Sequence, residues 1–285
     1  MVGERKQSKV SFPLPRDRYE VGQTPDRQAL RSAAERLCKE FVVYGNGPVY
    51  GLTANGEDPD VQSKIRAVKG ETRGSKQPLS LAISFEGFLP YIDHNKIENE
   101  SLRELFKDPK KVTRLLGGWT FVRAAAAEAA YSALPACAIS DRGRIQTYSP
   151  IGNTRTTMFL DYARLEGVRY PVMTSANRSS ASEIVDNEGA QKFANEQELP
   201  LVLNTLLTTE RPKPKGSYPV LELTPRAFRV VRAGFLRPEV MKSILADYPL
   251  EWPSDVKQPN YPEHLLGFED LSIHARSLQG EQLRA

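Results

Sequence analysis

Segments with helical periodicity alternate with short β-branched segments along the middle of the chain. Residues 24–40, "TPDRQALRSAAERLCKE", place leucines and alanines on one helical face and lead into "FVVY" at 41–44. Residues 58–70, "DPDVQSKIRAVKG", repeat this pattern and lead into "PLSLAIS" at 78–84. Such alternation is typical of an α/β domain in which helices flank a sheet. We therefore predict an α/β fold with a twisted mixed sheet.

Terminators and turn residues set the expected element boundaries. Pro25 suits the first position of a helix after Thr24 as N-cap, Asp58 is the expected cap of the second helix, and Gly70 is its expected end. The remaining expected helices are 102–116 with an interruption near Pro109, 154–167, 182–197 and 237–248. The remaining expected strands are 119–125, 170–177, 199–204, 218–224 and 227–234. The last two are close enough to form a hairpin, which makes the sheet mixed.

The two ends of the chain differ from its middle. Residues 1–24 and 248–285 mix prolines with charges and lack sustained periodicity, so we predict a poorly ordered N-terminal extension and a C-terminal tail. Residues 25–247 then form one domain, a size that can bury a substantial core.

Composition excludes several classes of protein. The chain has no run of about 18 apolar residues that would cross a membrane, and its start lacks an apolar leader, so we expect a cytoplasmic protein. Two distant cysteines, expected to be buried thiols, and three scattered histidines argue against a disulfide framework or a metal site. The net charge of +4 is compatible with nucleotide phosphates or RNA as partners.

The glycine-rich stretch 42–56, "VVYGNGPVYGLTANG", invites comparison with a dinucleotide-binding fingerprint. That pattern requires its third glycine where Tyr50 stands, and Pro48 removes an N–H from the segment that would bind a pyrophosphate. The stretch therefore needs another explanation.

Five short fragments follow one another along the chain, and their order is more informative than any one of them: "VYGLTANG", "KIRAVKG" with "QPLSL", "GGWTFV", "TSAN" and "VVRAG". Over roughly residues 26–245 this order resembles the YrdC-like family, whose best-known members are the threonylcarbamoyl-AMP synthases. The resemblance implies ATP with Mg²⁺, bicarbonate and an amino acid as substrates, and a role in tRNA modification. In that reaction a carbamate attacks the α-phosphate of ATP and pyrophosphate leaves. Positioning and charge stabilisation suffice for such chemistry.

The resemblance assigns a role to six residues. Lys69 and Arg73 would act in catalysis beside phosphate or carbamate oxygens, and the expected nucleotide-binding residues are Thr120, Ser175, Asn177 and Arg232. Each residue taken alone also suits an ordinary role. These roles are a solvated cation at a helix end, a strand residue, a turn and an exposed strand position.

The chain departs from the family pattern mainly on the side expected to hold the amino acid. The family's "PTDT" segment is replaced by residues 45–48, so Asn46 and Tyr50 belong to an altered substrate loop, in which "VYGL" is expected to turn from the strand into the groove. Family polar positions are occupied here by Glu71, Ala82, Tyr148, Tyr218 and Pro219. Arg73 would compensate for Glu71. Other nearby cations either refill the groove or form a solvated surface: Arg142, Arg144, Arg155 and Lys215.

Three functional hypotheses remain open. The first is a threonylcarbamoyl-AMP synthase-like nucleotidyltransferase whose amino acid or amine need not be threonine. The second is a non-catalytic paralogue that binds a nucleotide or double-stranded RNA. The third is an enzyme that carbamoylates or adenylates a specialised metabolite, which no feature of the sequence selects. Partner proteins are not predicted.

Overall fold

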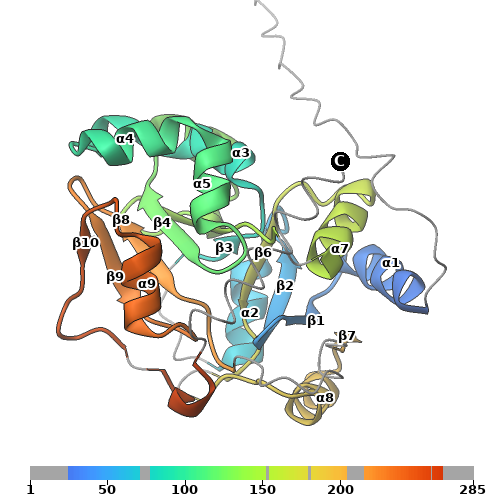
Figure 1. The fold of residues 1–285 in the computed structure, drawn as a ribbon. Helices are drawn as coiled ribbons and strands as arrows, with labels where there is room; N and C mark the ends of the chain where they lie inside the picture. The colour runs from blue at the N-terminus through green and yellow to red at the C-terminus, as the bar shows by residue number, and fades with distance from the viewer. Residues whose placement is uncertain are drawn as a thin grey trace, which may run out of the picture.

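A mixed ten-stranded sheet organises the part of the chain that the computed structural model describes, in the order β10-β9-β8-β4-β5-β3-β6-β2-β1-β7. The described residues are 25–70, 78–151, 154–178, 181–203, 215–257 and 259–265. Parallel pairs such as β4 with β8 occur beside antiparallel pairs such as β4 with β5. The predicted α/β fold with a twisted mixed sheet is confirmed (Figure 1).

The element bounds follow the alternation in the sequence. The strands are β1 (Val42–Asn46), β2 (Val49–Asn55), β3 (Ser80–Leu81), β4 (Phe121–Ala125), β5 (Arg144–Tyr148), β6 (Pro171–Ser175), β7 (Leu201–Val202), β8 (Val220–Leu223), β9 (Phe228–Arg232) and β10 (Leu250–Glu251). The α-helices are α1 (Pro25–Leu37), α2 (Val61–Lys69), α3 (Phe85–Phe88), α4 (Glu100–Lys107), α5 (Pro109–Leu116), α6 (Glu128–Ala133), α7 (Thr154–Leu165), α8 (Asn187–Glu196) and α9 (Pro238–Ile244).

Two groups of helices pack beside the sheet. Helices α3, α4 and α5 lie together beside β4, whereas α1 packs along α7 near β1 and β2 (Figure 1). Phe106 of α4 contacts Phe228 of β9 with ring centroids 5.9 Å apart, which anchors the first group to the sheet. Burying these apolar faces is the main favourable contribution to the stability of the fold. No helix among the described residues has the length and apolar composition that a membrane crossing requires.

The glycine-rich stretch forms a β-hairpin. Asn46 of β1 pairs with Val49 of β2, so Gly47 and Pro48 are the two turn residues. Gly47 has φ +59 and Pro48 cannot adopt a positive φ, which is the combination of a type II′ turn. The expectation that "VYGL" turns from the strand into a groove is wrong, because these residues lie inside β2 between β1 and β6. A glycine followed by any residue between two β-branched runs was the missed hairpin signal.

Predictions of one strand, one helix start and one helix cap failed where contacts between distant residues determine the local structure. Strand β5 was not predicted, because only its partners β3 and β4 distinguish it from a loop. Helix α8 begins at Asn187, later than expected, with Asp186 as its N-cap. Asp58 does not cap α2 but accepts a hydrogen bond from the N–H of Asp60 in the turn before it. By contrast, the interruption near Pro109 is confirmed, with Asp108 between α4 and α5.

Residues beyond the last helix contact the domain. Strand β10 pairs in parallel with β9, and the Val256 side chain is buried. The Tyr261 hydroxyl donates to the carbonyl of Glu183, 3.1 Å away. The division into extension, domain and tail stays a prediction, but the first part of the predicted tail lies against the sheet.

Candidate functional site

Three of the predicted site residues meet where α2 ends beside β6. The Lys69 ammonium donates to the carbonyl oxygen of Ser175, to its hydroxyl at 3.2 Å and to Oδ1 of Asn177 at 3.3 Å. Lys69 is only 5% exposed, so these oxygens replace water around a buried charge. The structure therefore brings together a cation from the "VKG" fragment and polar groups from the "TSAN" fragment.

Backbone geometry places this Lys69 cluster. Val61, Ile65 and Lys69 recur at helical spacing and are buried, which points the lysine inward. Gly70 ends the helix with φ +80, a conformation that glycine adopts without steric cost. On the other side, Ser175 pairs with Gly51 at the end of β6, and the Asn177 amide donates to the carbonyl of Ala181.

Two other predicted residues contact Tyr218 and Pro219, which directly precede β8. The Arg232 Nε donates to the carbonyl of Tyr218 at 2.9 Å. Burial lowers the pKa of Arg232 to about 10, so the guanidinium remains cationic at neutral pH. The fully buried Thr120 hydroxyl lies 3.2 Å from two carbonyl oxygens, those of Pro219 and Phe121, and can donate to either. Thr120 is therefore in contact with the residue that precedes β8.

The predicted substrate-loop residues are both buried. Asn46 Oδ1 accepts a hydrogen bond of 3.1 Å from the Thr156 hydroxyl on α7, and its carbonyl accepts one of 3.2 Å from Tyr218. The Tyr50 hydroxyl donates to Oδ1 of Asn187 on α8. The Asn46 side chain is thus part of the interior beside Tyr218, whereas the Tyr50 hydroxyl points to a different helix.

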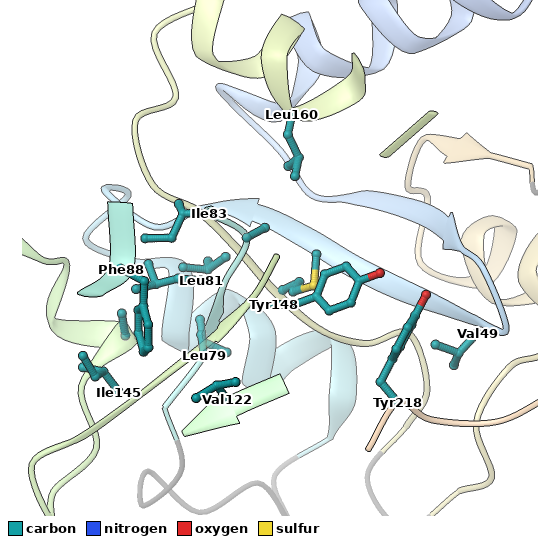
Figure 2. Packing of buried hydrophobic residues seen from close by; sticks show 14 of the residues in the cluster. Val49, Leu79, Leu81, Ile83, Phe88, Val122, Ile145, Tyr148, Leu160 and Tyr218 are labelled. Atoms are coloured by element: carbon teal, nitrogen blue, oxygen red, sulfur yellow. The ribbon is translucent and has the colours of Figure 1, made fainter. Parts of the chain in front are cut away.

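Aromatic rings fill the region where the family pattern has polar groups. Tyr148 and Tyr218 pack with centroids 4.7 Å apart, and Phe121 lies 5.1 Å from Tyr148. Figure 2 shows the two tyrosine rings side by side near Val49. Burial raises the pKa of both tyrosines well above the ordinary value, so their hydroxyls remain protonated donors. Contacts to a charged substrate through Tyr148 and Tyr218 require these rings to move.

The remaining predicted cations are dispersed. Arg73 and Glu71 lie outside the described residues. The Arg144 guanidinium pairs with Glu222 at 3.4 Å, and Arg155 donates to the carbonyl of Leu203. Other members of that set are the exposed Arg142 and the half-buried Lys215.

Glu183 is a polar residue that the sequence did not single out. Its Oε1 accepts a 2.6 Å hydrogen bond from Ser217, and its Oε2 accepts one from Asn260. Burial by itself raises the pKa of this carboxyl, but the hydrogen bonds and the nearby Lys257 lower it below the ordinary value. No local pattern could identify Glu183, because its partners are distant in sequence.

A cavity of about 340 Å³ lies at the opposite end of the β2–β6 pair from Ser175. Its walls include Gly56, Asp58, Cys137 and Tyr170. Among the predicted site residues that the structure describes, none lines it. Cys137 is a buried thiol as predicted, whereas Cys38 is only half-buried.

Comparison with solved structures identifies proteins of similar fold. The P. abyssi Sua5 structure complexed with L-threonine matches with a TM-score of 0.59 and 18% identity over 79% of this chain and 59% of Sua5. A variant of the same protein matches with a TM-score of 0.61 and 17% identity over 82% of this chain and 64% of Sua5. The chain therefore spans less than two thirds of the Sua5 chains.

Two further structures share the fold. E. coli YciO matches with a TM-score of 0.54 and 15% identity over 74% of this chain and 91% of YciO. Full-length HypF in a phosphate- and nucleotide-bound form matches with a TM-score of 0.53 and 18% identity over 72% of this chain and 24% of HypF. No protein-family model and no curated protein matches the sequence. The chain thus has the fold of Sua5 and YciO, as the YrdC-like resemblance implies, at identities that concern the fold alone.

Proposed function

We propose that the chain is an ATP-using nucleotidyltransferase that forms a carbamoyl-adenylate from bicarbonate and an amino acid or amine, releasing pyrophosphate. The observation that carries this proposal is the contact of Lys69 with Ser175 and Asn177, which joins two fragments expected to face the nucleotide. Structures with the same fold support it, because Sua5 was solved with L-threonine and HypF with phosphate and nucleotide.

The Lys69 ammonium supplies the charge that this reaction needs. Negative charge builds on the α-phosphate as the carbamate oxygen attacks and pyrophosphate leaves, and a preorganised cation stabilises it. A lysine ammonium has three N–H donors, and at least three protein oxygens already accept from it. A bound phosphate oxygen therefore replaces at least one of these acceptors.

The departures from the family pattern concern the acceptor substrate. Residues 45–48 hold no threonine, and the Asn46 side chain is engaged by Thr156. A site built to bind a substrate hydroxyl rejects analogues strongly, so losing those partners changes selectivity. The proposed amino acid or amine is accordingly not restricted to threonine.

Turnover of ATP to pyrophosphate, measured with bicarbonate and a panel of amino acids and amines, tests the proposal. We expect at least one member of the panel to support turnover. In the Lys69→Ala variant kcat/KM should fall by about 10²–10³-fold, the loss typical of a charge-stabilising group. The matched control is Lys64→Ala, which removes an exposed lysine of the same helix that pairs with Asp58.

Folding of the Lys69 variants is checked by thermal unfolding, because the substitution leaves Ser175 and Asn177 without their buried partner. If Lys69→Ala is unfolded, Lys69→Arg provides the second test, since it keeps the charge but changes its geometry. The proposal fails if no amino acid or amine supports turnover by the wild-type protein.

A second candidate function is favoured by the packing of Tyr148 and Tyr218, which fill the region where the family pattern has polar groups. This alternative is a non-catalytic module that binds a nucleotide or double-stranded RNA. It predicts RNA binding that weakens steeply between about 50 and 200 mM salt, together with no nucleotide turnover. RNA binding that is absent or independent of salt contradicts it.

A further inference from the structure

A row of polar side chains crosses three neighbouring strands away from the Lys69 cluster. Arg123 of β4 stands opposite Gln146 of β5 in the antiparallel register. The Gln146 Oε1 accepts a 3.0 Å hydrogen bond from Arg123 Nε, and the Gln146 amide donates to the Ser80 hydroxyl on β3. Gln146 and Ser80 are buried, so they hold the Arg123 guanidinium in one orientation.

The outer edge of the Arg123 guanidinium is available. Within the described part of the chain its two terminal nitrogens have no hydrogen-bond acceptor, and both retain some solvent-accessible area. A guanidinium fixed through Nε presents these two nitrogens as a planar pair of donors. That geometry matches two oxygens of a phosphate group.

The guanidiniums around Arg123 are only partly balanced by carboxylates. Arg144 and Arg232 lie near it on β5 and β9, and only Arg144 forms an ion pair, with Glu222, among the described residues. Burial lowers the pKa of Arg123, the Glu222 carboxylate opposite it on β8 raises that pKa, and repulsion from Arg144 lowers it. Burial lowers the pKa of Arg232 as well, the Glu183 carboxylate raises that pKa, and repulsion from Arg123 lowers it. A multivalent anion placed between these guanidiniums would relieve that repulsion.

Arg123 lies on the same face of the sheet as the Tyr148 ring. Phe121 pairs with Tyr148, and Arg123 pairs with Gln146, so both pairs lie on one face of the sheet two residues apart.

We infer that Arg123 is the fork that binds the diphosphate part of the substrate, with Arg144 and Arg232 as flanking cations. This role deepens the proposed function and rests on it for the identity of the substrate. Gln146 and Ser80 are positioning residues, since they hold the fork without reaching the anion. The ligand class is a diphosphate, as in pyrophosphate or the terminal phosphates of a nucleotide.

Calorimetric titration of the full-length protein with pyrophosphate tests the inference. We expect Arg123→Leu to weaken pyrophosphate binding at least tenfold, because it removes a charged pair of hydrogen bonds. Arg123→Lys should give an intermediate Kd, since it keeps the charge but loses the planar fork. The control is Lys110→Gln, which removes one exposed cation from α5 and should change Kd less than twofold.

Thermal unfolding reports whether the Arg123 variants remain folded, and adenosine binding, measured in parallel, reports whether any loss is confined to the anion. The inference is overturned if wild-type protein binds no pyrophosphate, or if folded Arg123→Leu and Arg123→Lys both bind it as tightly as wild type. Pyrophosphate binding that depends on Arg123 without any ATP turnover would leave the inference standing and refute the proposed function instead.

Discussion

Gly47 shows how a single missing side chain determines the packing around Tyr218. A Cβ added to Gly47 would lie 2.6 Å from the Tyr218 hydroxyl oxygen, and the backbone there has φ +59. Both constraints act on the same residue of the hairpin turn. The glycine-rich stretch was evident in the sequence, but the tyrosine that requires Gly47 was not, because Tyr218 lies just before β8, far along the chain.

Substituting Gly47→Ala should lower the free energy of unfolding by about 1–3 kcal/mol, through the strained φ and the clash with Tyr218. Urea denaturation measures this loss. Gly167→Ala is the matched control, because Gly167 has φ +95 and nothing within 4 Å of an added Cβ. If Gly47→Ala costs no more than Gly167→Ala, the contact with Tyr218 is not a constraint. Adding Tyr218→Phe to Gly47→Ala should recover part of the difference.

At the level of elements, strong local signals predicted the helices better than the strands. Pro109 fixed the interruption between α4 and α5, because proline cannot continue α4 but suits the first turn of α5. The short strand β5 lacked such a signal, and pairing with β3 and β4 alone identifies it. The residues of the candidate site were likewise predictable only where they belong to a recognisable fragment. The fragments of Lys69 and Ser175 were recognisable, whereas the Arg123–Gln146 contact exists only through strand register.

Asp108 provides the test at this level. Its carboxylate accepts hydrogen bonds from the N–H groups of Lys110 and Lys111, which satisfies two donors at the start of α5. Asp108→Ala should lower the free energy of unfolding by about 0.5–2 kcal/mol, measured by urea denaturation. Asp108→Asn keeps an acceptor oxygen and should lose much less. Equal losses for the two variants would mean that capping is not the cause.

Across the whole molecule, Glu183 connects segments that are far apart in sequence. Its carboxylate is bonded by Ser217, before β8, and by Asn260, beyond β10, while its carbonyl accepts from Tyr261. The carboxylate also lies near Arg232, whose charge it favours. This contact brings the part of the chain after β10 to the loop that follows Ser175 and Asn177. Local periodicity carried no information about it, since every partner is non-local.

Because the pKa of Glu183 is lowered from 4.5 in the folded protein, its ionised form stabilises the fold above that value. The stabilisation is lost as pH falls below 4.5 through the lower folded pKa. The Gln variant cannot titrate, so the stability difference between wild type and Glu183→Gln should be largest at neutral pH and shrink below pH 4.5. Urea denaturation across this range measures it, with the exposed Glu166→Gln as control. A difference that stays constant with pH would show that the Glu183 charge does not hold the C-terminal segment to this loop.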